Sequence, residues 1–205
     1  MGSILVTGVP GIGRTTLLRS VRAKVGLPIV TFGSVMYNVA RSRGLLSHRD
    51  EMRRLPPEAQ LEVQRVAALS VAKLGTCVVD THLTVLTPHG MLAGMPMPIL
   101  QSMQPMRILM VEAAPVEIRA RRKRCKDRQH DDETEEQVEA HQALNRAMAM
   151  SLANLTGATV KIIFNHENKP ENAVAQLLES MRGVPVTSIR RLLREDPYLA
   201  EEVPG

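Results

Sequence analysis

An α/β fold with a parallel sheet between two layers of helices is predicted from three features of this sequence. Short apolar runs alternate with longer stretches of helical periodicity, which is the pattern of β-α-β units. The chain has 205 residues, of which 44% are hydrophobic, so it can bury the core of one domain with small insertions. A glycine-rich segment joins the first apolar run directly to the first helical stretch.

The candidate strands are short apolar runs, each ending at polar residues, glycine or proline. Runs of this length are typical of strands buried in a parallel sheet. They cover residues 3–7, 28–32, 76–80, 107–111 and 159–164.

Helical stretches separate these runs. One follows the glycine-rich segment and ends at Gly26 and Pro28, one begins near Ser34, and one extends from Pro56 to Gly75. Proline at the first turn and glycine after the last turn are ordinary helix boundaries.

Three further helices complete the pattern. One follows Pro115, and one begins at a capping box formed by Thr134 and Gln137. The last starts near Pro170 and ends at Gly183. We expect residues 1–183 to form the domain and residues 184–205 an appendage, in which a short helix could form around Ile189, Leu192 and Leu193.

Composition narrows the set of partners. The formal net charge of +5 permits anionic ligands, but the 2% of aromatic residues provides no stacking platform for single-stranded nucleic acid, so nucleic acid is not an expected partner. No apolar run approaches the length of a membrane span, and no targeting segment precedes the first strand, so no membrane partner is expected. Cys77 and Cys125 suit reduced thiols in a cytoplasmic protein better than a disulfide framework.

The glycine-rich segment has the pattern of a phosphate-binding P-loop. It matches G-x-x-x-x-G-K-[ST] with one change, because Arg14 stands where lysine is expected. Backbone N–H groups of such a loop converge on phosphate oxygens, and the following helix adds its positive dipole end. An ordinary tight turn between a strand and a helix is the alternative. The predicted ATP-binding residues are Gly8, Val9, Pro10, Gly11, Ile12, Gly13, Arg14, Thr15 and Thr16.

Arginine keeps the positive charge of lysine but brings a bulkier planar group. We therefore expect Arg14 to preserve phosphate binding better than it preserves the alignment of a γ-phosphate.

Two residues are candidates for holding Mg²⁺ with ATP. Thr15 stands where a P-loop hydroxyl ligates the metal, and Asp80 ends an apolar run as in a Walker B element. Asp80 would lie near the loop if the two strands are neighbours. A strand-terminal aspartate that caps a turn is the alternative.

Two basic clusters could bind anionic groups by bidentate arginine contacts. The first covers residues 49–54 and includes Arg53; a solvated helix face is its alternative. The second could form a basic lid, or could be neutralised by the acids at residues 131–136. Its members are Arg119, Arg121, Arg122, Lys123, Arg124, Lys126 and Arg128.

Two histidines have different expected roles. His82 follows the candidate metal ligand at the mouth of the site and could contact substrate. His141 lies on an apolar helical face and is expected to be a buried histidine with its hydrogen bonds satisfied.

Six segments together resemble the archaeal-type adenylate kinases, and the resemblance extends from about residue 2 to residue 182. A P-loop alone would indicate only a nucleotide-binding protein, so the other five segments make the match specific. The matching segments are residues 6–13, 32–36, 49–55, 79–82 with 87–90, 141–146 and 156–163.

The resemblance implies reversible transfer of the γ-phosphoryl group of MgATP to AMP, on the P-loop NTPase fold with a five-stranded parallel sheet. It implies an NMP-binding segment at about residues 33–75, a lid at about residues 119–133 and a homotrimer. The AMP side would include Arg53, His82 and Gly90. The catalytic charges would be those of Arg14, Arg53, Arg121, Arg128 and Arg146.

Two departures from the family pattern keep other functions open. Arg14 is one, and His130 stands in the lid where the family pattern has an arginine. A kinase for another nucleoside monophosphate is one alternative. An ATP-binding regulatory protein with little transferase activity is the other.

Overall fold

A computed structural model describes residues 2–87, 90–124, 133–184 and 196–199, except for the side chains of Asp50 and Arg53. Its centre is a five-stranded parallel sheet in the order β2-β3-β1-β6-β7. The strands are β1 (Ile4–Thr7), β2 (Ile29–Thr31), β3 (Val78–Asp80), β6 (Arg107–Glu112) and β7 (Thr159–Phe164). The α/β fold and the five predicted strands are confirmed.

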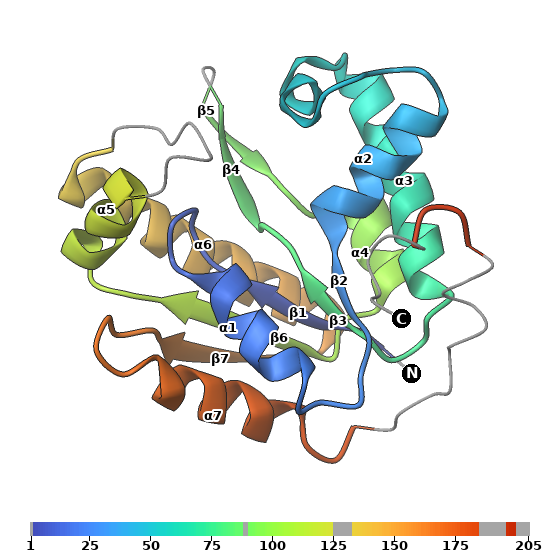
Figure 1. The fold of residues 1–205 in the computed structure, drawn as a ribbon. Coiled ribbons are helices and arrows are strands. Elements are labelled where there is room, and N and C mark those ends of the chain that lie inside the picture. Colours follow the sequence, from blue (N-terminus) through green and yellow to red (C-terminus); the bar gives the residue numbers. More distant parts are fainter. Residues whose placement is uncertain (1, 88–89, 125–132, 185–195, 200–205) are drawn as a thin grey trace.

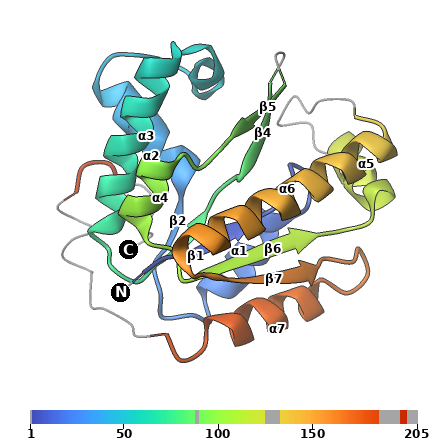
Figure 2. The same ribbon diagram turned by 180° about the vertical axis from the view of Figure 1, so that it is seen from behind.

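The helices cover both faces of this sheet, as Figures 1 and 2 show from opposite sides. Helices α1 (Arg14–Arg22) and α7 (Pro170–Met181) lie on one face, and α6 (Glu135–Thr156) lies on the other. Helices α2 (Phe32–Ser42), α3 (Pro57–Ala72) and α4 (Met97–Met103) pack together beside β2. A 3₁₀ helix η1 (Arg49–Arg54) precedes α3, and α5 (Pro115–Arg124) follows β6.

Alternate side chains of β1 lie on opposite faces of the sheet and pack into different parts of the core. Ile4 and Val6 pack into a buried cluster with side chains of α1 and α7, whereas Leu5 packs into a second cluster with side chains of α2 and α3. All three side chains are fully buried. The period of two along a strand therefore supplies apolar side chains to both layers, as a doubly covered sheet requires.

Two local features differ from the sequence-based expectations. Phe32 begins α2 instead of ending a strand. The segment after Asp80, for which no strand was predicted, forms an antiparallel hairpin of β4 (Thr84–Thr87) and β5 (Gly90–Ala93). Its strands are only four residues long and have no clear alternation of buried residues, so periodicity did not reveal them. Figure 1 shows the hairpin extending away from the sheet beyond β3.

One further prediction concerns the appendage at the C-terminus. The short helix expected around Ile189, Leu192 and Leu193 lies outside the described residues. Within the part of the chain that the structure describes, none of the helices is long and apolar enough to span a membrane.

The base of the hairpin depends on a close backbone approach at Gly94. A Cβ atom there would lie 2.0 Å from the carbonyl oxygen of His82, and the Gly94 amide donates to the Leu83 carbonyl at 2.8 Å. Gly94→Ala is therefore expected to lower the free energy of unfolding by about 1–3 kcal/mol, because backbone must move. Urea denaturation measures this change.

Gly33→Ala is the matched control, because Gly33 lies within α2 and its added methyl would meet only the end of the Arg49 side chain at 3.4 Å. That variant should be neutral or slightly stabilised. Equal stability of the two variants would contradict the observed hairpin base.

Candidate functional site

The glycine-rich segment connects the carboxyl end of β1 to the N-terminus of α1. Gly11 and Gly13 both have left-handed backbone conformations, with φ of 87° and 88°. A Cβ atom would lie 2.6 Å from the Arg122 side chain at Gly11 and 2.7 Å from the Asn165 side chain at Gly13. Both glycines are therefore required by conformation and by close packing.

Side chains from α5 and from the end of β7 hold the carbonyl groups of this loop. Arg122 donates from Nε to the Pro10 carbonyl at 2.9 Å. Arg121 and Asn165 donate to the Ile12 carbonyl at 3.1 and 2.7 Å. Asn165 was not predicted as a site residue, and its position directly after the last candidate strand was the available signal.

The N-terminus of α1 suits an anion. Among the described residues no side chain caps this end, and its first turn has no acidic residue. Thr15 and Thr16 are exposed there. Unpaired N–H groups and the helix dipole at such an end attract phosphate.

Arg14 turns toward β3 and the base of the hairpin. Its Nη1 donates to the Gly8 carbonyl at 2.8 Å, its Nη2 lies 3.0 Å from His82 Nε2, and its Nε forms an ion pair with the Asp80 carboxylate. The side chains of Arg14 and Asp80 are only 10% and 9% exposed. The residue that replaces the P-loop lysine is therefore held by three groups.

Asp80 lies beside the loop because β3 is a neighbour of β1. The two strands pair in parallel, with Val6 opposite Asp80, so the expected proximity is confirmed. The carboxylate of Asp80 and the exposed hydroxyl of Thr15 are hard oxygen donors of the kind Mg²⁺ prefers, and Asp80 already faces a cation.

No group of three or more His, Cys, Asp or Glu side chains in the described part of the chain could form a metal cage.

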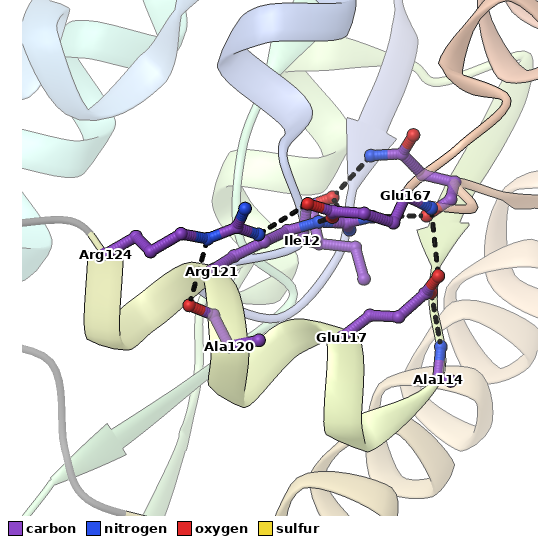
Figure 3. Close-up of polar contacts among 8 residues, drawn as sticks. Ile12, Ala114, Glu117, Ala120, Arg121, Arg124 and Glu167 are labelled. Atoms are coloured by element: carbon purple, nitrogen blue, oxygen red, sulfur yellow. Dashed lines mark hydrogen bonds and ion pairs between the residues drawn. The ribbon is translucent and has the colours of Figure 1, made fainter.

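Figure 3 shows how Glu167 holds two arginines of α5. Arg121 donates from Nε to Glu167 at 2.7 Å, and Arg124 donates to its other carboxylate oxygen at 2.5 Å. The two arginines hold the pKa of Glu167 below its ordinary value. Glu117, on the same helix, accepts from the Glu167 amide at 2.9 Å and fixes this loop against α5.

A chain of buried polar contacts connects the loop to the hairpin. Arg122 donates to Glu133 at 2.7 Å, Glu133 lies 3.5 Å from Nδ1 of His141, and Nε2 of His141 lies 3.1 Å from the Thr84 hydroxyl. Thr84 in turn donates to Asn145 at 3.3 Å. His141 is therefore buried, as its position on an apolar face predicted. Its Nδ1 makes no hydrogen bond within the described part of the chain and has only the longer contact to Glu133, so the expectation that both ring nitrogens are satisfied is met at Nε2 alone.

Burial lowers the pKa of His141 from its ordinary value of 6.5, against the opposing effect of Glu133. The unfolded chain then binds more protons than the native protein below pH 6.5. The stabilising effect of neutral His141 is therefore complete above that pH and is lost as the pH falls. Between pH 7.5 and 5.5, the free energy of unfolding from urea titrations should fall less for His141→Gln than for the parent protein. Equal losses would contradict this interpretation.

Arg146 of α6 pairs with two acids, Glu112 at the end of β6 and Glu139 on its own helix. It makes a bidentate pair with Glu112, with both distances 2.8 Å, and a further contact to Glu139 at 3.2 Å. The hydrogen bonds that Arg146 donates to the Glu112 carboxylate raise the pKa of Arg146 above its ordinary value. Glu112 was not predicted as a site residue, although it ends an apolar strand in the same way as Asp80 does.

The candidates for the AMP side are only partly brought together. His82 meets Arg14 at the base of the hairpin, whereas Gly90 pairs with Thr87 at its far end. Arg53 lies in η1, and its side chain is outside the described part of the structure. Arg128 and His130 also lie outside the described residues.

Comparison with known proteins agrees with this geometry. A family model described as an AAA domain matches residues 7–139. The chain is 45% identical over 191 residues to an adenylate kinase of Methanopyrus kandleri, covering 90% of this chain and 100% of that protein. It is 42% identical over 180 residues to an adenylate kinase of Methanothermobacter thermautotrophicus, covering 86% and 97%.

Solved structures agree on the fold alone. A shikimate kinase from Bacteroides thetaiotaomicron superposes with a TM-score of 0.55 at 16% identity, covering 88% of this chain and 98% of that one. A shikimate kinase from Acinetobacter baumannii gives 0.56 at 12%, covering 90% and 96%. The sequence relatives, together with the loop of β1 and its neighbouring Asp80, place this chain in the adenylate kinase family.

Proposed function

We propose that this protein is an adenylate kinase of the archaeal type, which reversibly transfers the γ-phosphoryl group of MgATP to AMP to give two ADP. The observation that carries the proposal is a P-loop surrounded by arginines in a chain 45% identical to an adenylate kinase over that protein's full length. An oxygen of the AMP phosphate attacks the γ-phosphorus, and the bond from that phosphorus to the β,γ-bridging oxygen breaks.

The chain supplies alignment and charge neutralisation for this step. The loop from Gly8 to Thr16 binds the ATP phosphates with backbone N–H groups. The catalytic charges come from Arg14, Arg53, Arg121, Arg128 and Arg146. Arg14, Arg121 and Arg146 each have a carboxylate partner, so phosphate oxygens must compete with Asp80, Glu167 and Glu112 for them.

Domain assignments follow from the same proposal. Residues 1–183 form the kinase domain, with an NMP-binding segment at about residues 33–75 and a lid at about residues 119–133. Arg53, His82 and Gly90 contact AMP. Closure of the lid excludes water, which otherwise competes as the phosphoryl acceptor.

Thr15 and Asp80 hold Mg²⁺ in this proposal, the hydroxyl and the carboxylate each supplying a hard oxygen ligand. When bound there, the ion would supply positive charge that offsets the negative charge of the ATP phosphates. Asp80 must release Arg14 to accept the metal, because the two side chains form an ion pair.

We also propose a homotrimer in the cytoplasm. Strand β7 lies at the edge of the sheet and exposes Ile162 and Phe164, and Met150 of α6 is 60% exposed. Exposed apolar side chains of this kind at a sheet edge suit an interface between copies. Cys77 is a buried free thiol, as expected for a protein in a reducing compartment.

Product analysis tests the activity. Purified protein is incubated with MgATP alone and then with AMP, GMP, CMP or UMP, and nucleotides are separated by ion-exchange chromatography. ADP formation that depends on AMP is expected. Preferred use of another monophosphate would keep the mechanism and change the acceptor. Nucleotide binding without transfer would instead support a regulatory protein, which the Arg14–Asp80 pair would then hold in an inactive arrangement.

A further inference from the structure

Residues 196–199, near the C-terminus, pack on a side of the molecule that is remote from α7. Residues 196–199 follow α7 by fewer than twenty positions in the sequence, but Figures 1 and 2 both show them beside α3. Leu199 is 0% exposed and Asp196 is 6% exposed. A loose appendage would expose both side chains, so this segment is a docked part of the fold.

The segment contacts two helices at once. The Asp196 carboxylate accepts from Lys73, the residue at the C-terminal end of α3, at 3.0 Å. The Tyr198 carbonyl accepts from the side chain of Asn38 in α2 at 3.0 Å. These two contacts place the segment across both helices.

Its own hydrogen bonds fix its shape. Asp196 accepts from the Tyr198 amide through its side chain at 3.0 Å and from the Leu199 amide through its carbonyl at 3.1 Å. The Tyr198 amide and Lys73 are thus the two hydrogen-bond donors to the buried Asp196 carboxylate. The resulting turn directs Leu199 into the buried cluster that includes Val39 of α2 and Ala68 of α3.

We propose that residues 196–199 form a strap that positions the AMP-binding helices α2 and α3, with Asp196 and Leu199 as its positioning residues. This inference rests on the proposed function, because it takes α2 and α3 as parts of the NMP-binding segment. The strap lies outside residues 1–183, and hydrogen bonds join it to Lys73 at the end of α3 and to Asn38 of α2. By holding α2 and α3 in one arrangement it lowers the ordering cost of AMP binding and leaves ATP binding unchanged.

Kinetics and hydrogen–deuterium exchange of the full chain and three variants test the strap. The variants are Asp196→Asn, Leu199→Ala and a chain that ends at residue 184. Each is expected to raise the KM for AMP by about 3- to 10-fold, with kcat and the KM for ATP changed by less than about twofold. Amide exchange should become faster in α2 and α3 and stay the same in α1 and α7.

Glu179→Gln is the matched control, because it weakens an exposed pair with Lys161 at 3.5 Å on the opposite side of the molecule. It should change neither readout. A general loss of stability would instead speed exchange in all helices and would not separate the two KM values.

Three outcomes decide between the possibilities. Unchanged exchange in α2 and α3 for Asp196→Asn and Leu199→Ala overturns the strap, and these point variants decide even if the shortened chain fails to fold. Faster exchange in α2 and α3 together with an unchanged KM for AMP overturns its role in AMP binding. Faster exchange in a protein that transfers nothing to AMP supports the strap and rejects the proposed function.

Discussion

Replacing Arg14 with alanine is expected to lower kcat by about 100- to 1,000-fold, the range found when one preorganised donor to a transition state is removed. Arg14 pairs with Asp80 and donates to the Gly8 carbonyl of the loop proposed to bind the ATP phosphates. Its removal also leaves the buried Asp80 carboxylate without its ion-pair partner, which destabilises the native protein. Steady-state kinetics of ADP formation and urea denaturation measure the two effects.

Arg14→Lys separates charge from shape. Lysine keeps the positive charge and reaches the terminal phosphates as a compact group. We expect it to raise kcat by about two- to fivefold relative to the parent protein, because it aligns the γ-phosphate better than the planar guanidinium does. An unchanged or lower kcat would mean that Arg14 already aligns the phosphate in this site. A raised KM for ATP in Arg14→Ala, with kcat unchanged at saturating ATP, would limit the role of Arg14 to affinity.

Glu133→Gln is expected to cause the largest loss of stability among the single substitutions considered. It removes the charge that pairs with Arg122 at 2.7 Å, where the two side chains are 9% and 6% exposed. Breaking a buried ion pair from one side costs about 3–5 kcal/mol, because the remaining charge stays buried and uncompensated. The free energy of unfolding from urea titrations measures the loss.

Two comparisons make this result specific. Glu167→Gln removes a carboxylate that also pairs with arginines of α5 but is exposed, so its effect on stability should be small. The double variant Arg122→Met with Glu133→Leu should recover much of the lost stability, because it leaves no unpaired charge. A loss in the double variant as large as in Glu133→Gln would show that the pair is not the cause.

The strands and the phosphate-binding loop could be predicted because their signals are local. The apolar composition of residues 3–7 and 76–80 predicted buried strands, and the spacing of Gly8 and Gly13 predicted the loop. Asp80 was expected to lie near the loop if β1 and β3 are neighbours, and the structure shows that these two strands pair. A parallel sheet brings the carboxyl ends of its strands to one edge, so few arrangements had to be considered.

The pairing of charges was not predictable in the same way. The basic residues 119–128 and the acids after them suggested mutual neutralisation, and Arg119 with Glu135 and Arg122 with Glu133 confirm it in part. Arg121 and Arg124 instead pair with Glu167, and Arg146, outside that run, pairs with Glu112. These partners are separated by more than thirty positions in the sequence, and nothing in the periodicity of α5 or β6 indicates which acid lies opposite which arginine. A long arginine side chain can also reach several acids, so composition does not determine which of them it pairs with.

The amino-acid sequence determined the layered α/β fold, the phosphate-binding loop and the kinase family, because periodicity and motif spacing are properties of neighbouring residues. The folded chain alone determined that Arg14 turns onto Asp80, that the segment after Asp80 becomes a hairpin, and that residues 196–199 return to α2 and α3. Each of these depends on contacts between residues far apart in the sequence. Such contacts form only when the core has packed their elements side by side. Local composition therefore does not indicate which residues will meet.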